Sequence, residues 1–542
     1  MRKRIEDSDM IDNKKELERA ELHKTIWQIA NDLRGSVDGW DFKQYVLGML
    51  FYRFISENIT KYINELQNEK GFNYVSLDDK LVTNDIKIDI IKEKGFFILP
   101  SQLFANVVKK SSTDVNLNVT LDNIFKSIES SATGTDSEKN FKGLFDDIDV
   151  NSKKLGNNVV NINKSLDKLL KAVADFKLGN YDMQTIDTFG DAYEYLMNMY
   201  AANAGKSGGE YFTPQEVSEL LAEISLIDFN NKNENGVPLD KKEVNKVYDP
   251  ACGSGSLLLK FAKILGKENV KNGFFGQEKN ITTYNLCRIN MFLHDINYEQ
   301  FDIAHGDTLL EPHHWDDEPF EAIVSNPPYS IKWDGDSNPL LINDPRFSPA
   351  GVLAPKGKAD LAFCMHILSW LSSNGTASIV EYPGILSRGG KEKQIRKYLI
   401  DNNFVDTVIQ LPSDLFFGNT ISTCILVLRK NKKETNIHFI DASKEFVRIE
   451  TKNKLSSDNK NRILSSIKLK NNEDFFSRYT RYEEVVENQY DLSIGQYVKQ
   501  NNETEEIDIK RLNDRIKYIV SNSDRLRKEI SYLINYLEGS ND

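Results

Sequence analysis

Four consecutive residues near the middle of the chain, Asn326, Pro327, Pro328 and Tyr329, could hold and activate a planar amine. Such an amine is a poor nucleophile because its lone pair is delocalised. The Asn326 side-chain carbonyl and a proline backbone carbonyl are two acceptors for its two N–H groups, and holding both pushes the nitrogen toward a tetrahedral, attacking geometry. The prolines fix the turn and supply no competing N–H, and the tyrosine ring can stack on a flat substrate. Taken alone, a structural Pro-Pro turn explains these residues equally well.

A glycine-rich segment upstream has the sequence of a cofactor-binding loop. Residues 249–258 read Asp-Pro-Ala-Cys-Gly-Ser-Gly-Ser-Leu-Leu and lie between a predicted strand at 244–248 and a predicted apolar helix that continues to 265. In a doubly wound sheet, such a strand–turn–helix unit lets a nucleotide cofactor approach the backbone at the glycines. Because Leu258 occupies the position of the third glycine of the dinucleotide fingerprint, a pyrophosphate is not the expected ligand.

Two acidic residues follow at the ends of further predicted strands. Glu278 ends a short run that begins at Gly273, and its carboxylate can accept both hydroxyls of a ribose. Asp307 follows Gly306 at the end of a third strand, where it can reach an adenine amine. Either acid alone is more often a loop charge or a helix cap. The order and spacing of the three segments together favour a cofactor site.

In this order the segments resemble those of γ-type amino-methyltransferases that use S-adenosylmethionine, and specifically the modification subunits of type I restriction-modification systems. The resemblance covers most of residues 20–450. It includes four further segments of the sequence: Gly209 to Gln215, Lys358 to Phe363, Ser387 to Gly390, and Leu411 to Phe417. The polar run at 380–384 departs from the family pattern and leaves one wall of the pocket undefined.

The resemblance implies an α/β fold: a Rossmann-like S-adenosylmethionine-dependent methyltransferase domain with an N-terminal all-α domain and a C-terminal helical, coiled-coil-like tail. It implies that Asn326 and the Pro327 carbonyl orient the target amine, with Pro328 and Tyr329 completing the catalytic site, and that the segment at 209–215 closes over the methionine moiety. The residues expected to bind the cofactor are Glu210, Tyr211, Phe212, Thr213, Pro214, Gln215, Asp249, Ala251, Gly253, Ser254, Gly255, Glu278 and Asp307.

The activity implied is methylation of adenine N6 in DNA, with base flipping to deliver the target. Cytosine-N4 methylation is a close alternative, although Asn rather than Ser at position 326 favours adenine within the resembled families. Methylation of a protein glutamine amide uses the same Asn-Pro-Pro-Tyr arrangement, but the helical flanks and the segments after residue 358 argue against it. An inactive assembly scaffold is a further alternative, which the intact motifs at 249–255 and 326–329 disfavour.

The charge of the chain bears on its partners. Among 542 residues, 81 Asp and Glu outnumber 69 Lys and Arg, which gives a formal charge of −12. A protein that binds DNA tightly by itself carries a basic surface, since phosphate neutralisation supplies most nonspecific affinity. The segment 330–357 is too short for a target-recognition region and is interpreted as a mobile lid over the substrate. We therefore expect a separate specificity subunit to read the double-stranded DNA. The resemblance adds a second copy of the modification subunit and a restriction/translocase subunit as partners.

The sequence contains no apolar signal core and no membrane-spanning run, so we expect a cytoplasmic protein with no membrane partner. His313 and His314, with His305 nearby, lie in a polar loop and are expected to be solvated, so no metal site is expected. The cysteines form no CxxC pair, which indicates neither a disulfide framework nor a zinc site. The four cysteines are Cys252, Cys287, Cys364 and Cys424.

Hydrophobic periodicity predicts three regions. Residues 1–175 are expected to form an all-α domain, 176–475 the catalytic α/β domain, and 476–542 a helical segment. The resemblance implies that this last segment contacts the specificity subunit. Near the end of the chain, residues recur at alternating three- and four-residue steps: Ile509, Leu512, Ile516, Ile519, Ser523, Leu526, Ile530, Leu533 and Leu537. This heptad seam predicts a coiled coil with a partner or, equally, an amphipathic helix packed on its own domain.

Overall fold

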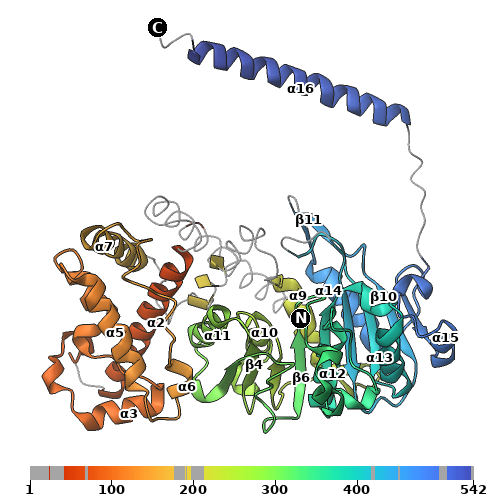
Figure 1. Cartoon of the computed structure of the whole chain (residues 1–542), viewed down its shortest axis with the longest axis horizontal. Coiled ribbons are helices and arrows are strands. Elements are labelled where there is room, and N and C mark those ends of the chain that lie inside the picture. Colours follow the sequence, from red (N-terminus) through yellow and green to blue (C-terminus); the bar gives the residue numbers. More distant parts are fainter. Residues whose placement is uncertain are drawn as a thin grey trace. The chain divides into compact units, whose positions relative to one another are not determined.

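The fold is described from a computed structural model of the protein (Figure 1). The chain divides into two compact units, Met1–Val498 and Lys499–Asp542. The residues that the structure describes are 24, 42–67, 71–175, 189–190, 192–193, 195–196, 213–416, 421–449, 452–499 and 509–538.

The N-terminal part of the first unit is helical, as the sequence predicts. Its helices bury one apolar face each: in α7, Leu166, Leu170 and Val173 are fully enclosed. The ends are set by local chemistry, since Thr83 caps the N-terminus of α3 and Gly95 ends it with a φ of 82°. The helices are α2 (Phe42–Gln67), α3 (Asn84–Lys94), α4 (Phe104–Lys110), α5 (Leu117–Ser131), α6 (Glu138–Phe141) and α7 (Val159–Asp175).

A nine-stranded sheet follows, in the order β13-β10-β8-β9-β7-β6-β3-β4-β5. Strands β9 and β13 are antiparallel to their neighbours, and the remaining strands are parallel to one another. The strands are β3 (Val247–Asp249), β4 (Phe274–Glu278), β5 (Phe301–His305), β6 (Phe320–Ser325), β7 (Leu371–Glu381), β8 (Val405–Gln410), β9 (Cys424–Arg429), β10 (Ile437–Asp441) and β13 (Ser477–Thr480).

Helices cover both faces of this sheet (Figure 1). Along β3, Val247 packs into one hydrophobic core and Tyr248 into the other, because successive side chains of a strand point to opposite faces. One face is covered by α9 (Gln215–Ser225), α10 (Ser256–Leu265), α11 (Ile281–Leu293) and α14 (Ser457–Leu469), and the other by α12 (Asp360–Trp370), α13 (Gly390–Asp401) and α15 (Tyr482–Glu487). The expected doubly wound α/β architecture is therefore confirmed.

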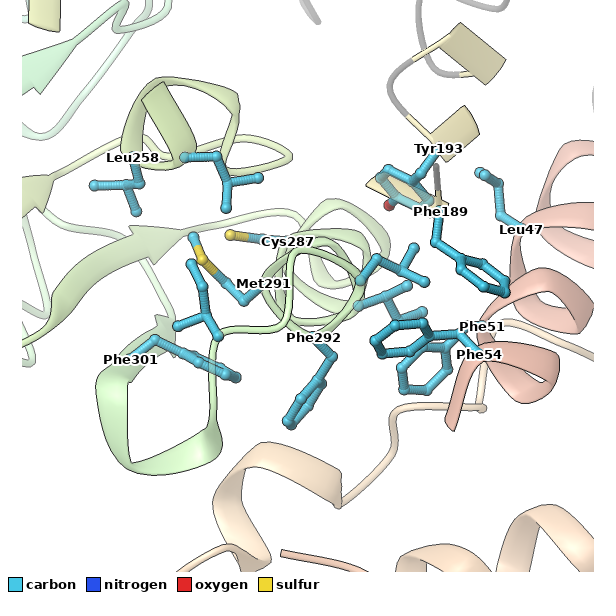
Figure 2. Close-up of a cluster of buried hydrophobic side chains, with 14 of the residues drawn as sticks. Leu47, Phe51, Phe54, Phe189, Tyr193, Leu258, Cys287, Met291, Phe292 and Phe301 are labelled. Carbon is cyan, nitrogen blue, oxygen red and sulfur yellow. The ribbon is translucent and has the colours of Figure 1, made fainter. Parts of the chain in front are cut away.

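The helical part shares its core with the sheet through α11. Figure 2 shows Phe51 and Phe54 of α2 beside Phe189 and the α11 residue Phe292, in one buried cluster. The ring centroids of Phe51 and Phe292 lie 6.1 Å apart, and those of Phe54 and Phe189 5.2 Å apart. The buried Arg288 of α11 also donates hydrogen bonds to three backbone carbonyls of the helical part: those of Lys139, Asn140 and Lys142.

The sheet continues past residue 475, where the catalytic domain was expected to end. Strand β13 pairs with β10, and the Tyr497 ring stacks on Phe439 of β10 with centroids 3.9 Å apart. The second compact unit begins only at Lys499 and contains α16 (Ile509–Glu538). Residues Leu512, Ile516 and Ile519 of its seam are about half exposed. None of the helices in the described ranges is long and apolar enough to cross a bilayer.

Two small hairpins complete the fold. One is formed by β1 (Ile227–Lys232) and β2 (Pro238–Asp240), and the other by β11 (Val447–Ile449) and β12 (Lys452–Lys454).

Candidate functional site

The site lies where the strand order reverses. From β3 the chain proceeds to β4 and β5 on one side, whereas β6 lies on the other side of β3. Connections that leave neighbouring strands in opposite directions open a crevice at the carboxyl ends of these strands, which is where open α/β sheets bind ligands. Asp249 ends β3, and Asn326 directly follows β6. The topology thus brings the predicted cofactor loop and the predicted catalytic turn together.

Asp249 connects these two segments. Its Oδ1 accepts hydrogen bonds from the Ser325 hydroxyl at 2.9 Å and from the Ala251 N–H at 3.0 Å. Its Oδ2 is buried and has no hydrogen-bond partner among the described residues. Burial raises the pKa of Asp249 to about 7, against the lowering effect of the hydrogen bonds from Ala251 and Ser325. An orphaned acceptor at this place fits a cationic ligand group.

The two glycines of the loop have different roles. Both have positive φ values, 55° at Gly253 and 80° at Gly255, which disfavour other residues. A Cβ at Gly253 meets nothing within 4 Å, so its backbone faces open space. A Cβ at Gly255 lies 2.8 Å from Cys287 Sγ and 3.0 Å from Met291 Cε, so this glycine lets the loop pack against α11. The neighbouring Ser254 carbonyl accepts a hydrogen bond from Asn290 of α11 at 2.8 Å.

The two predicted acidic residues lie at the ends of β4 and β5 and are partly exposed. Glu278 accepts the N–H groups of Gly253 at 3.0 Å and Asn280 at 2.8 Å, which fixes its carboxylate beside the glycine loop. A carboxylate oxygen can accept more than one hydrogen bond, so this orientation is compatible with the expected ribose contact. Asp307 forms an ion pair of 2.8 Å with Lys279, which raises the pKa of Lys279.

Asn326 is held from both ends of its amide. Its Nδ2 donates to the Thr213 hydroxyl at 2.9 Å, and its Oδ1 accepts from the Tyr329 hydroxyl at 2.6 Å. Thr213 is buried, whereas Asn326 and Tyr329 are partly exposed, and Pro327 between them is buried. Thr213 was expected to contact the cofactor, and the structure places its hydroxyl on Asn326.

The rest of the segment at 210–215 is only partly described. Glu210, Tyr211 and Phe212 lie outside the described residues. Pro214 is buried and occupies the position before the first residue of α9. The Gln215 side chain accepts a hydrogen bond from the buried Lys260 ammonium of α10, which ties the two helices together.

Asp360 holds the backbone directly after the predicted catalytic turn. The Ser330 backbone has a φ of 51°, a value that costs energy for any residue with a side chain, and its N–H donates to Asp360 Oδ1 at 2.8 Å. Asp360 is buried in the first turn of α12. The sequence marked the segment from Lys358 to Phe363 as part of the resemblance and assigned no role to this residue. An acidic residue at a predicted helix start was the available signal.

The polar run at 380–384 is explained by Glu381. This residue ends β7, beside β6, and is fully buried. Burial, reinforced by the negative charge of Asp360, raises the pKa of Glu381 well above its usual range. Its Oε1 accepts a contact from the Cys364 thiol at 3.3 Å. The raised pKa favours the uncharged form, which is the form of a carboxyl that burial penalises least.

Two expectations about loops need correction. The segment 330–357 was interpreted as a mobile lid, but it is packed into the second core through five buried apolar side chains: Trp333, Leu341, Phe347, Leu353 and Ala354. Its Arg346 is also buried and donates to the carbonyls of Thr308 and Leu309, each at 2.8 Å. His314 was expected to be solvated and is instead buried, with its ring nitrogens 2.9 Å from the Gly276 carbonyl and 3.0 Å from Asp317.

Comparison with known families adds an independent result. Residues 184–506 match the family model for N-6 DNA Methylase, and residues 22–173 match the model for the HsdM N-terminal domain. Together these two matches span the nine-stranded sheet and the helical part.

Individual proteins give the same picture. The chain is 48% identical to the type I restriction enzyme MpnII methylase subunit of Mycoplasma pneumoniae, with 97% of each chain covered. It is 34% identical to the type I restriction enzyme MjaVIII methylase subunit of Methanocaldococcus jannaschii, over 62% of this chain and 56% of that protein. The crystal structure of the type I restriction-modification methyltransferase subunit from Streptococcus thermophilus superposes with a TM-score of 0.78 at 33% identity, covering 89% of this chain and all of that one.

Proposed function

We propose that this chain, which belongs to the methylase subunits of type I restriction-modification systems and is an adenine-specific DNA methyltransferase, transfers the methyl group of S-adenosylmethionine to N6 of an adenine chosen by a separate specificity subunit. The observation that carries this proposal is the contact between the two motifs. Ser325, which precedes Asn326 in the chain, donates to Asp249 of the glycine loop. A methyl donor bound at the loop and an amine held at Asn326 would therefore be neighbours.

The residues at the carboxyl ends of β3 and β4 fit S-adenosylmethionine. The buried Asp249 Oδ2 suits the ammonium of its methionine part, the open face of Gly253 allows close approach, and Glu278 is oriented for the ribose hydroxyls. When bound, this group supplies an electrophilic methyl on a sulfonium. Glu210, Tyr211 and Phe212 remain proposed contacts on the basis of family resemblance.

Asn326 and Pro327 hold the target amine in the proposed mechanism. Asn326 Oδ1 and the Pro327 carbonyl accept its two hydrogens, and Thr213 fixes the Asn326 amide so that the oxygen is presented. Flipping the base costs a few kcal/mol, and stacking on Tyr329 returns about 1–3 kcal/mol. The amine nitrogen would bond directly to the methyl carbon as the bond from that carbon to sulfur breaks, so sulfur leaves as a neutral thioether. The amine would lose one proton to solvent, and no covalent enzyme intermediate is needed.

Reading of the target sequence is assigned to the specificity subunit. The net charge of −12 disfavours tight DNA binding by this chain alone, and the segment 330–357, packed into the core, offers no separate reading domain. The exposed seam of α16 provides a surface for the specificity subunit. A second copy of this subunit and the restriction subunit complete the proposed complex, whose substrate, DNA, is in the cytoplasm.

Co-expression with the specificity subunit tests the proposal. Modified bases are mapped across the host genome by single-molecule sequencing, with Asn326→Ala as the matched inactive control. We expect N6-methyladenine at one recognition sequence with the wild-type chain and none with the variant. Cytosine-N4 modification, or methylation of a protein glutamine in place of DNA, would contradict it.

A further inference from the structure

The β11–β12 hairpin is a basic feature of an acidic chain. Residues 444–454 contain four cations, Lys444, Arg448, Lys452 and Lys454, against two acidic residues, whereas the whole chain has a formal charge of −12. One of these acids, Glu445, is already paired with Arg462 of α14. Within the described part of the chain, neither Lys444 nor Lys454 forms an ion pair, and both are exposed. We name the described residues of this segment, 444–449 and 452–454, the basic hairpin.

The basic hairpin lies at the carboxyl ends of the parallel strands, as the proposed catalytic turn does. Strand β10 runs in the same direction as β8, β7, β6 and β3. Its last residue, Asp441, is therefore at the same end of the strands as Asp249 and Asn326. The hairpin begins three residues after β10 ends and is labelled at β11 in Figure 1. It is thus on the substrate side of the domain.

The hairpin is fixed in place by the loop after β8. The Asn453 side chain donates to the Ser413 carbonyl at 2.8 Å, and its backbone N–H donates to the Asp414 carbonyl at 3.2 Å. Lys452 donates to the Phe416 carbonyl at 3.0 Å, and Arg448 lies 3.4 Å from the Asp414 carboxylate. Arg448 and Lys452 thus bind the loop after β8. Lys444 and Lys454 take no part in these contacts and can bind an external anion.

The hairpin leads into α14, which is tied to α9. Lys460 of α14, six residues after Lys454, pairs with Glu219 of α9 at 2.5 Å. Thr213, two residues before α9 begins, accepts the hydrogen bond from Asn326. A duplex with its target base at Asn326 would therefore pass close to the hairpin.

We infer that the basic hairpin binds the DNA backbone beside the target base, with Lys444 and Lys454 neutralising phosphates. The inference rests on the proposed function and adds a contact surface on this subunit. Such contacts position a duplex and carry no sequence information, which agrees with reading by another subunit. Val447 and Ile449, 43% and 51% exposed, are on the same face of the hairpin as Lys454 and can pack on the sugars.

The test uses the complex of the full chain with its specificity subunit and a short fluorescent duplex. The variant is Lys444→Gln with Lys454→Gln. The matched control is Lys242→Gln with Lys433→Gln. It removes the same charge from two exposed lysines that precede β3 and β10, at the amino ends of the strands. DNA affinity is measured between about 50 and 200 mM salt.

The logarithm of the association constant falls with the logarithm of the salt concentration, and each lost phosphate contact makes this negative slope shallower by about 0.9. We therefore expect the slope of the hairpin variant to be shallower by about 1.8 and its Kd to rise roughly tenfold. The control should match the wild type, and turnover at saturating DNA should be unchanged in both. An unchanged slope in the hairpin variant would overturn the inference while wild-type methylation still supports the function. Failure of the variant to assemble with the specificity subunit would also overturn it, because the hairpin would then be a protein contact.

Discussion

The Tyr329 hydroxyl donates a 2.6 Å hydrogen bond to Asn326 Oδ1, the same oxygen that is proposed to accept the target amine. A carbonyl oxygen has two lone pairs, so the tyrosine and an amine can be accepted together. With Thr213 on the amide nitrogen, the side chain is oriented before the substrate arrives. Such preorganisation avoids a reorientation cost during the reaction.

Replacing Asn326 by Ala should abolish methyl transfer and leave cofactor binding nearly intact. The change removes an acceptor needed in the transition state, and we expect turnover to fall by at least about 100-fold, which corresponds to about 3 kcal/mol. Calorimetry should give an unchanged S-adenosylmethionine affinity. Thr213→Ser, which keeps the hydroxyl that orients Asn326, is the matched control and should retain activity. Near wild-type turnover in Asn326→Ala would contradict the mechanism.

The two loop glycines should respond differently to substitution by Ala. Gly253→Ala incurs the cost of a positive φ, about 1–2 kcal/mol, and should weaken cofactor binding tenfold or more because the new methyl occupies the open face. Gly255→Ala adds a collision with Cys287 and should be the less stable protein in thermal unfolding. Removing the sulfur with Cys287→Ala should restore part of the stability of Gly255→Ala and none of the affinity of Gly253→Ala. Glu278→Ala should lose affinity by a similar factor, and normal binding by it or by Gly253→Ala would mean that the pocket is misplaced.

Cofactor affinity should depend on pH through Asp249. Its pKa in the folded chain is about 7, above the ordinary value of 3.8, so the folded chain holds this proton more tightly than the unfolded chain does. The contribution of Asp249 to the free energy of unfolding is therefore present at low pH and is lost as the pH rises through 7. The ionised form pairs with an ammonium, so affinity should rise through pH 7 and fall again above about 7.7, where an α-amino group loses its proton. Asp249→Asn should bind more weakly and lack the rise through pH 7, as measured by calorimetry across this range. An unchanged profile in the variant would remove Asp249 from the proposed contact.

Asp360 should affect turnover more than substrate binding. Asp360→Ala frees the Ser330 N–H, and a displacement of about 1 Å in the catalytic turn can cost about 100-fold in rate. Asp360→Asn keeps an acceptor and should retain most activity. Ser330→Gly keeps the N–H and relieves the positive φ, so it should be as stable as the wild type or more so. Equal losses of kcat in the Ala and Asn variants would argue against positioning through this hydrogen bond.

The sequence predicted the doubly wound sheet and the two main motifs because these depend on local order: strand, glycine turn and helix at 244–265, and an apolar run before Asn326. Features that depend on distant partners were missed. His314 is buried because its ring nitrogen reaches the Gly276 carbonyl of β4, and the different roles of Gly253 and Gly255 depend on Cys287 of α11. The end of the catalytic unit was placed at 475 because the pairing of β13 with β10 leaves no periodic signal in four residues.

The central claim is transfer of a methyl group to adenine N6 at Asn326 with the target read by another chain. The most direct measurement uses S-adenosylmethionine labelled in its methyl group and a duplex that contains the recognition sequence, followed by hydrolysis and separation of the nucleosides. With the specificity subunit present, the label should appear only in N6-methyladenine, and it should be absent with Asn326→Ala. The chain alone, and the chain truncated after Val498 with the specificity subunit added, should bind S-adenosylmethionine and transfer little label. Label in N4-methylcytosine, or sequence-specific transfer by the isolated chain, would contradict the account.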